Sequence, residues 1–396
     1  MLPPLYGRWI SDLLGGPLPE EQAATCSDCV QCQSHVPEGY RFADATKCCT
    51  YVPALPNFLV GGALKAGSLA GRERLLRRMV AQPDSITPHG LDATDDERDR
   101  YRDILAAEQF GRDASLFCPY YLAEAGGLCG VWRNRNGICA TWYCKHDRGA
   151  RGQRFWQALE VLLTAVEREL SHWCACTILF EETPPVEGGE AAWSWWAGRE
   201  GDFFRRCAEL VEALGWSEVQ ALVGPAIETQ VGDLLAAHAA LAGPLPDSLQ
   251  LGTIRVSHRG DERSRVVTYL DTDALELPTA LLDLLPRFDG RPTGAVLAKL
   301  RGLGVEVSPP SCACSSTSSC SPPPPDLPNP RPAARHRERT AASDCPFGHV
   351  QGAMSCRACP LEHLLASASP ARPQGPAAGF RRRSTATRGS ARVRAP

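Results

Sequence analysis

The sequence has no hydrophobic run long enough to cross a membrane. The longest apolar stretch without charge near its start is Pro53–Leu64, whereas a membrane-spanning helix needs about 20 consecutive apolar residues. The first residues, MLPPLYGRWISDLLGG, also lack a basic segment followed by an apolar run, which is the pattern of a secretion signal. We therefore expect a cytoplasmic protein with no membrane partner.

Signatures of several common enzyme classes are also missing. The sequence contains no glycine-rich phosphate loop, no Gly-x-Ser-x-Gly nucleophile elbow and no His-Glu-x-x-His helix. The formal net charge is only −3. This balance argues against a nucleic-acid partner, because contacts with phosphates need a basic surface.

Lysine is absent from the last part of the chain. Residues 309–396 contain 12 arginines and four acidic residues, which gives a net charge of +8. Because the whole chain has a net charge of −3, residues 1–308 have a net charge of −11. The same segment holds 15 of the 33 prolines and little apolar side chain. We predict that it is a disordered tail rich in proline, arginine and serine. A shifted reading frame in GC-rich DNA is one hypothesis for arginine without lysine.

The clearest helix is predicted over residues 151–173. Its apolar side chains recur at helical spacing and form one stripe: Phe155, Leu159, Leu162, Leu163, Val166, Leu170 and Trp173. His172 falls in the last turn of this predicted helix, where a partial positive charge suits the helix dipole. Further helices are predicted over residues 201–214 and about 219–241.

Residues 250–308 have a different pattern. Leu251–His258 and Arg265–Leu270 indicate two strands around the turn RGDE. The segment LPTALLDLLPRFDG indicates a helix that ends at Gly290, and Thr293 can cap a second helix, TGAVLAKLRGLG. A hairpin with two short helices is typical of a small winged-helix-like module.

These patterns predict a mainly α fold with a small β hairpin. The predicted domains are a cysteine-cluster metal-binding domain (1–150), a helical domain (151–248), the winged-helix-like module (249–308) and the tail (309–396). Within the first domain, the charged segments Gly71–Met79 and Asp95–Tyr101 are predicted to be exposed helical surface.

Cysteine is the residue that stands out, with 18 in the chain. Nine of them form two groups: Cys26, Cys29, Cys32, Cys48 and Cys49, then Cys118, Cys129, Cys139 and Cys144. Two-residue gaps allow successive thiolates to meet at one ion, as in zinc sites and iron–sulfur clusters. Because neither group alone supplies a complete, well-spaced ligand set, we predict that Cys48, Cys49, Cys118, Cys129, Cys139 and Cys144 converge in space.

Two other interpretations of the nine cysteines stay open. They could be buried free thiols that act as small hydrophobic residues, as we expect for the isolated Cys207. They could also form disulfides, although the odd number and the absence of a secretion signal disfavour this.

Further residues could add to a metal site. His35 and His146 lie beside cluster cysteines and could replace a thiolate or donate a hydrogen bond to one, and Cys174 and Cys176 follow the predicted helix directly. The tail has zinc-knuckle-like spacing at Cys345, His349, Cys356, Cys359 and His363, a match that biased composition can also produce by chance.

Two segments, KCCTYVPALPNF and CPYYLAEAGGLCGVWRNRNGICATWYC, resemble the YkgJ-type cysteine-cluster family of zinc- or iron-chelating proteins. The matching positions are Cys48, Cys49, Cys118, Cys129 and Arg135 with Cys139. The resemblance covers roughly residues 25–150, about a third of the chain. It departs from the family pattern in the fifteen residues between Cys32 and Cys48, and at Asn136, where the family has proline.

Three functions follow from these observations. The first is a cytosolic protein that binds zinc, iron or an iron–sulfur cluster through the nine cysteines. The second is a metal-dependent enzyme that modifies a protein substrate, because the relatives of the YkgJ-type family include flagellin lysine N-methylases. The third is an interaction module in which zinc only stabilises a helical scaffold and the winged-helix-like part binds a peptide or DNA, although the charge of −11 over residues 1–308 disfavours DNA.

Overall fold

The computed structural model describes residues 2–21, 39, 41–182, 189–242 and 247–302. This part of the chain is mainly helical with small antiparallel sheets, which confirms the predicted fold class at that level. The helices are α1 (Pro4–Leu14), α3 (Asn57–Ala66), α4 (Leu69–Ala81), α5 (Asp95–Ala106), α6 (Gly137–Thr141), α7 (Gly149–Glu181), α8 (Gly189–Ser194), α9 (Glu200–Glu212), α10 (Trp216–Val223), α11 (Glu228–Ala242), α12 (Thr279–Leu282) and α13 (Thr293–Gly302). In the described ranges no helix is long and apolar enough to span a membrane.

The strands are short and pair antiparallel in four small sheets. They are β1 (Leu55–Pro56), β2 (Ile86–Thr87), β3 (Gly90–Leu91), β4 (Tyr121–Leu122), β5 (Leu128–Cys129), β6 (Ser248–Gln250), β7 (Arg255–Arg259), β8 (Arg263–Val267), β9 (Leu275–Pro278) and β10 (Asp289–Pro292). The sequence predicted only one hairpin, because pairs of two-residue strands leave no alternating pattern to detect.

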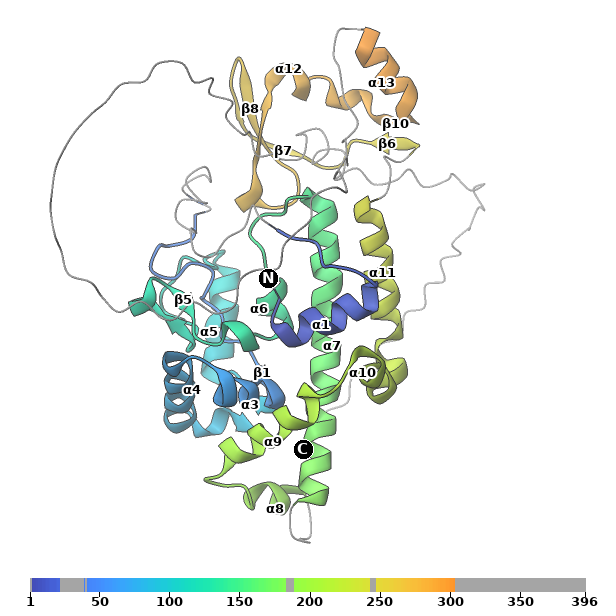
Figure 1. Cartoon of the computed structure of the whole chain (residues 1–396). Helices are drawn as coiled ribbons and strands as arrows, with labels where there is room; N and C mark the ends of the chain where they lie inside the picture. The colour runs from blue at the N-terminus through green and yellow to red at the C-terminus, as the bar shows by residue number, and fades with distance from the viewer. Residues whose placement is uncertain (1, 22–38, 40, 183–188, 243–246, 303–396) are drawn as a thin grey trace, which may run out of the picture.

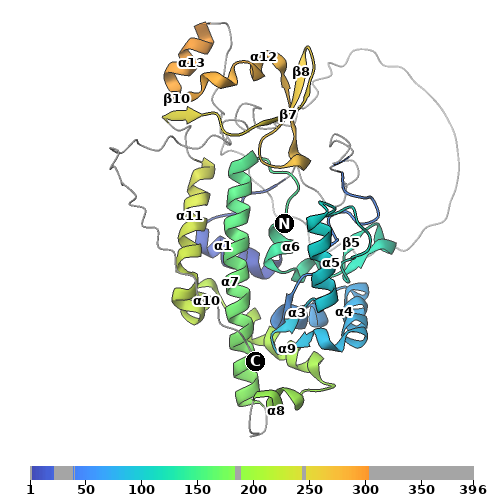
Figure 2. The same ribbon diagram turned by 180° about the vertical axis from the view of Figure 1, so that it is seen from behind.

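Helix α7 is the axis of the fold. Figures 1 and 2 show it running through the centre, with α11 alongside it and α9 at its C-terminal end. The predicted helix is confirmed and extends to Glu181. Its stripe is buried, since Phe155, Leu159 and Leu170 each have an exposed fraction of 0%. The prediction that His172 lies in the last turn is wrong, because the helix continues beyond it through Cys174 and Cys176 to Glu181.

Helix α3 packs closely against α9. A Cβ atom built on Gly61 would lie only 1.7 Å from the carbonyl oxygen of Phe204. The two backbones can approach this closely only because position 61 has no side chain. Both helices then contribute to one apolar core with α1, α7, α10 and α11, so the core draws on residues from both sides of position 150.

A second apolar core lies within residues 247–302, here called the C-terminal module. Its buried members include Leu249, Val266, Leu277, Leu285, Phe288 and Leu300. The predicted hairpin around RGDE is confirmed as β7 and β8, and β9 adds a third strand. The exposed arginines of this hairpin are matched by carboxylates, as in the pairs Arg259–Asp283 and Arg265–Glu276.

Two predicted helices are broken by proline. The helix expected over 219–241 is divided into α10 and α11 by a 3-10 turn, Gly224–Ile227, which contains Pro225. The helix expected before Gly290 is reduced to α12 and a 3-10 turn, Leu285–Arg287. Proline lacks the N–H that would continue the helical hydrogen bonds. Of the predicted winged-helix-like module, the structure shows the hairpin and the helix that begins at Thr293, and the module as a whole stays a prediction. The predicted tail (309–396) lies outside the described residues.

Candidate metal centre

The adjacent pair Cys48 and Cys49 lies in a loop that is tied to a distant turn. The amide of Gly111 donates to the hydroxyl of Thr50 at 2.7 Å, and the Thr46 hydroxyl donates to the carbonyl of Gly111 at 2.9 Å. The amide of Cys49 donates to the carbonyl of Thr46 at 3.0 Å. These bonds fix the backbone on which both thiols stand.

Cys118 and Cys129 are brought together by the hairpin of β4 and β5. Tyr121 pairs with Cys129 in this hairpin, and the amide of Tyr121 donates to the carbonyl of Cys118 at 3.0 Å. The amide of Cys118 donates in turn to the carbonyl of Cys49 at 2.9 Å. This last bond joins the two cysteine groups of the sequence, and it supports their predicted convergence at the level of the backbone.

Cys139 stands on the short helix α6, and Asn136 caps that helix. The Asn136 side-chain oxygen accepts from the amide of Cys139 at 3.0 Å, and its side-chain nitrogen donates to the carbonyl of Ala54 at 3.0 Å. Asparagine can do both, whereas the proline of the family pattern can do neither. Asn136 therefore fixes Cys139 to the chain that follows Cys49.

Helix α6 is also anchored on α7. The amide of Gly137 donates to the Glu167 carboxyl at 2.5 Å, and the Tyr6 hydroxyl donates to the same oxygen. Glu167 is buried, and burial raises its pKa from 4.5 to about 8. The apolar stripe predicted for this helix does not include Glu167, although its spacing of four residues from Leu163 puts it at the edge of the buried face.

The thiols of these segments influence one another. The pKa of Cys48 is raised by its hydrogen bond to Cys49, then by burial. Burial raises the pKa of Cys118, and charge on Cys139 or Cys129 would raise it further. The pKa of Cys139 is raised by burial, then by charge on Cys129, with a smaller contribution from Cys48. The structure thus brings five of the nine predicted ligands into one neighbourhood, in which several thiolates together need a compensating positive charge.

Arg135 is one buried cation beside these thiols. Its guanidinium lies 3.5 Å from the centre of the Trp132 ring and donates to the carbonyl of Cys139 at 2.9 Å. It acts to lower the pKa of Cys48 and of Cys139, against the larger effects that raise both.

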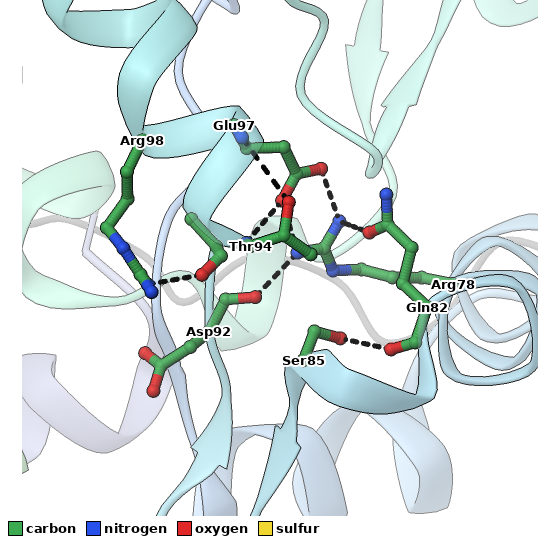
Figure 3. Close-up of polar contacts among 8 residues, drawn as sticks. Arg78, Gln82, Ser85, Asp92, Thr94, Glu97 and Arg98 are labelled. Carbon is green, nitrogen blue, oxygen red and sulfur yellow. Dashed lines mark hydrogen bonds and ion pairs between the residues drawn. The ribbon is translucent and has the colours of Figure 1, made fainter.

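Arg78 is a second cation near the site. It forms a two-pronged ion pair with Glu97, with both N–O distances at 3.0 Å, and donates to the carbonyl of Asp92 at 2.6 Å (Figure 3). Its positive charge acts to lower the pKa of Cys118. The prediction that this part of 71–79 is exposed surface is wrong for Arg78, whose side chain is 3% exposed. Its spacing from Gly71 and Leu75, both buried, places it on the inner face of α4.

Other predicted residues have other surroundings. The carbonyl of Cys144 accepts from the Thr272 hydroxyl at 2.7 Å, and the amide of His146 donates to Asp273 at 3.2 Å, so both residues contact the C-terminal module. Cys26, Cys29, Cys32 and His35 lie outside the described residues, as do the tail cysteines and histidines.

The remaining cysteines stand on α7 and α9. Cys207 is buried, as predicted, and its carbonyl accepts from the Cys174 thiol at 3.8 Å. Cys176 is exposed, and its sulfur lies 3.5 Å from Nε2 of His172. Cys174 and Cys176 are expected from the sequence to be able to reach the cysteine cluster. In the structure both thiols contact other partners instead.

All nine cysteines of the described segments are free thiols. In these segments no three cysteine, histidine or carboxylate side chains are yet arranged around one point as a finished metal site. The donor chemistry is nevertheless that of a soft or borderline metal, because thiolates favour zinc, cuprous copper and iron–sulfur clusters. No protein-family model matches the chain, and neither does any curated protein or solved structure.

Proposed function

We propose that this protein binds zinc, iron or an iron–sulfur cluster through its clustered cysteines, in the cytoplasm. Cys48, Cys49, Cys118, Cys129 and Cys139 are the ligands that the structure supports, with Cys26, Cys29, Cys32 and Cys144 as further ligands of the same proposal. The observation on which the proposal rests is the backbone hydrogen bond that joins the segments of Cys118 and Cys49, together with the contact of Asn136 with Ala54 that adds the segment of Cys139.

A metal ion would supply the positive charge that these clustered thiolates need. Burial, then charge on neighbouring thiolates, raises the pKa of Cys118 and of Cys139, which favours the protonated thiols while no metal ion is bound. A metal ion displaces these protons, and the thiolates then neutralise its charge. Arg135 and Arg78 remain nearby to offset excess negative charge, which a set of four or more thiolates around one divalent ion creates.

Metal binding requires the thiols to move, because no three donor side chains surround one point in the described residues. The ties at Thr50, Asn136 and Gly137 hold the three segments together, and we propose that the sulfurs converge on the metal by side-chain rotation. This is the regime in which metal binding contributes to the stability of the surrounding loops. Binding of a partner by the predicted winged-helix-like module (249–308) belongs to the same proposal, and Thr272 and Asp273 of its described part contact Cys144 and His146.

The test is metal analysis of the full chain purified without oxygen, together with its visible spectrum. We expect at least one zinc or iron per chain, and iron with acid-labile sulfide would identify a cluster by its broad absorption. Cys139→Ser should lose most of this metal. Cys207→Ala is the matched control, because Cys207 is buried on α9 against Cys174 and should keep the wild-type content. A metal-free wild-type protein, or equal metal in both variants, would contradict the proposal.

A further inference from the structure

Three side chains of the types that bind metals, two histidines and one cysteine, lie together on the surface of the molecule, apart from the cysteine cluster described above. His172 and Cys176 stand one turn apart on the same face of α7, with Nε2 of His172 3.5 Å from the Cys176 sulfur. The ring of His89, from the turn between β2 and β3, stacks on the ring of His172 with 5.6 Å between the ring centres. All three side chains are exposed.

The turn that carries His89 is fixed to α7 by one buried side chain. Asn57 donates from its side-chain nitrogen to the carbonyl of Pro88 at 2.9 Å and to the carbonyl of Ser171 at 2.8 Å. Its backbone amide donates to the carbonyl of His89 at 2.8 Å. Because Ser171 directly precedes His172, these bonds hold the two histidines beside each other before any ligand arrives.

This arrangement is separate from the proposed cysteine centre. Cys174 precedes Cys176 by two residues, a rotation of about 200° around a helix, and it is buried against α9. Cys176 points instead to the solvent-facing side of α7, where His172 is its partner. The inference therefore does not depend on the function proposed above.

We propose that His89, His172 and Cys176 form a second site for a divalent transition metal, with zinc as its ion. Residues four apart on a helix lie on one face, which allows His172 and Cys176 to bind one ion together. Two neutral imidazoles and one thiolate are a ligand set that zinc accepts, with water in a fourth position. The Cys176 thiol gives up its proton to solvent as the zinc–sulfur bond forms.

The rings must turn before all three donors face one ion, because they do not yet converge on a point. The side chains are exposed, and the rotation of an imidazole about its last torsion has broad minima. The stacking places His89 beside His172, whose Nε2 lies 3.5 Å from the Cys176 sulfur, and the Asn57 contacts tie the His89 turn to α7.

The test uses the reactivity of Cys176 as a local readout. The full-length protein is alkylated with iodoacetamide, with and without micromolar zinc, and the rate at Cys176 is followed by peptide mass spectrometry. Since the thiolate is the reactive form and zinc would occupy it, we expect zinc to slow alkylation at Cys176 about tenfold or more, which is about 1.4 kcal/mol.

The variants His89→Ala and His172→Ala should each lose this protection. His258→Ala is the matched control, because His258 is an exposed histidine on the distant strand β7 and its loss should leave the protection intact. The ratio of rates with and without zinc is compared within each variant, so that a changed reactivity of the free thiol does not enter. Thermal unfolding of each variant checks that it is folded.

Two results would overturn the second site. The first is an unchanged alkylation rate at Cys176 in the presence of zinc. The second is equal protection in His89→Ala or His172→Ala, which would mean that the thiol binds zinc without these partners. Cys139→Ser, which should lose metal from the cysteine centre, should keep the zinc protection of Cys176. Failure of one proposal is thereby distinguished from failure of the other.

Discussion

The backbone amide of Cys118 donates a hydrogen bond to the carbonyl of Cys49 at 2.9 Å. Two cysteine segments that are far apart in the sequence thus meet directly through their main chains. Cys139 joins them from a third segment, α6, through the Asn136 contact with Ala54.

Asn136 should stabilise both α6 and the neighbouring loop. Asn136→Ala removes the helix cap and the bond to Ala54, so we expect a loss of about 1–3 kcal/mol in the free energy of unfolding. Asn136→Asp can still accept from the Cys139 amide but cannot donate to Ala54, so it should lie between alanine and wild type. Denaturant unfolding measures all three proteins. An aspartate variant as unstable as alanine would show that the bond to Ala54 carries the effect.

The ion pair between Arg78 and Glu97 should contribute far more to the free energy of unfolding than the exposed pair of Arg77 with Glu73 on the same helix. Arg78→Met leaves Glu97 without its buried partner, which typically costs about 3–5 kcal/mol. Arg77→Met is the control, because Arg77 is exposed and lies 3.7 Å from Glu73; it should cost about 0–1 kcal/mol. Equal losses in chemical denaturation would contradict the burial assigned to Arg78.

Glu167 should make the stability depend on pH. Its pKa rises from 4.5 to about 8 on folding, so the folded protein binds a proton that the unfolded chain has released. The stability contribution is present below pH 4.5 and falls as the pH rises towards 8, by at most about 1.4 kcal/mol per pH unit. Glu167→Gln removes this dependence, so the free energy of unfolding of the variant, relative to that of the wild type, should increase between pH 5 and pH 8. Parallel stability curves for the two proteins would contradict this.

Gly61 should tolerate no side chain. A Cβ atom there meets the Phe204 carbonyl oxygen at 1.7 Å, so Gly61→Ala forces α3 and α9 apart and should cost about 1–3 kcal/mol. Gly7→Ala in α1 is the control, because nothing lies within 4 Å of its added Cβ, and helix propensity should then favour alanine by up to about 1 kcal/mol. Thermal unfolding distinguishes the two. A neutral Gly61→Ala would show that the helices pack less closely.

Much of the helical scaffold can be predicted from the sequence, because its signal is local. The apolar stripe of α7 and the hairpin of β7 and β8 repeat with clear periods, and both are observed. The breaks at Pro225 and Pro286 follow from proline chemistry as well. The helices predicted from the sequence continue through both prolines because the prediction gives their apolar pattern more importance than the N–H that proline lacks.

The site is harder to predict because its geometry depends on long-range contacts. Cysteine spacing identifies the candidate ligands, but the meeting of Cys118 with Cys49 depends on how two loops fold together. Arg78 and Glu167 are charged residues on helices whose other faces are solvated, and only their spacing from buried neighbours indicates that they point inward. A charged residue at such a position is usually assigned to the surface, since burial of an unpaired charge is costly.

X-ray absorption at the edge of the bound metal reports directly which atoms bind it. It is made on the Cys176→Ser chain, purified without oxygen, so that the exposed site of His89, His172 and Cys176 does not contribute. We expect a first shell of about four sulfurs at ~2.3 Å, reduced or lost when Cys139 is also replaced by serine. A shell dominated by nitrogen or oxygen at ~2.0–2.2 Å would contradict a centre built from the clustered cysteines.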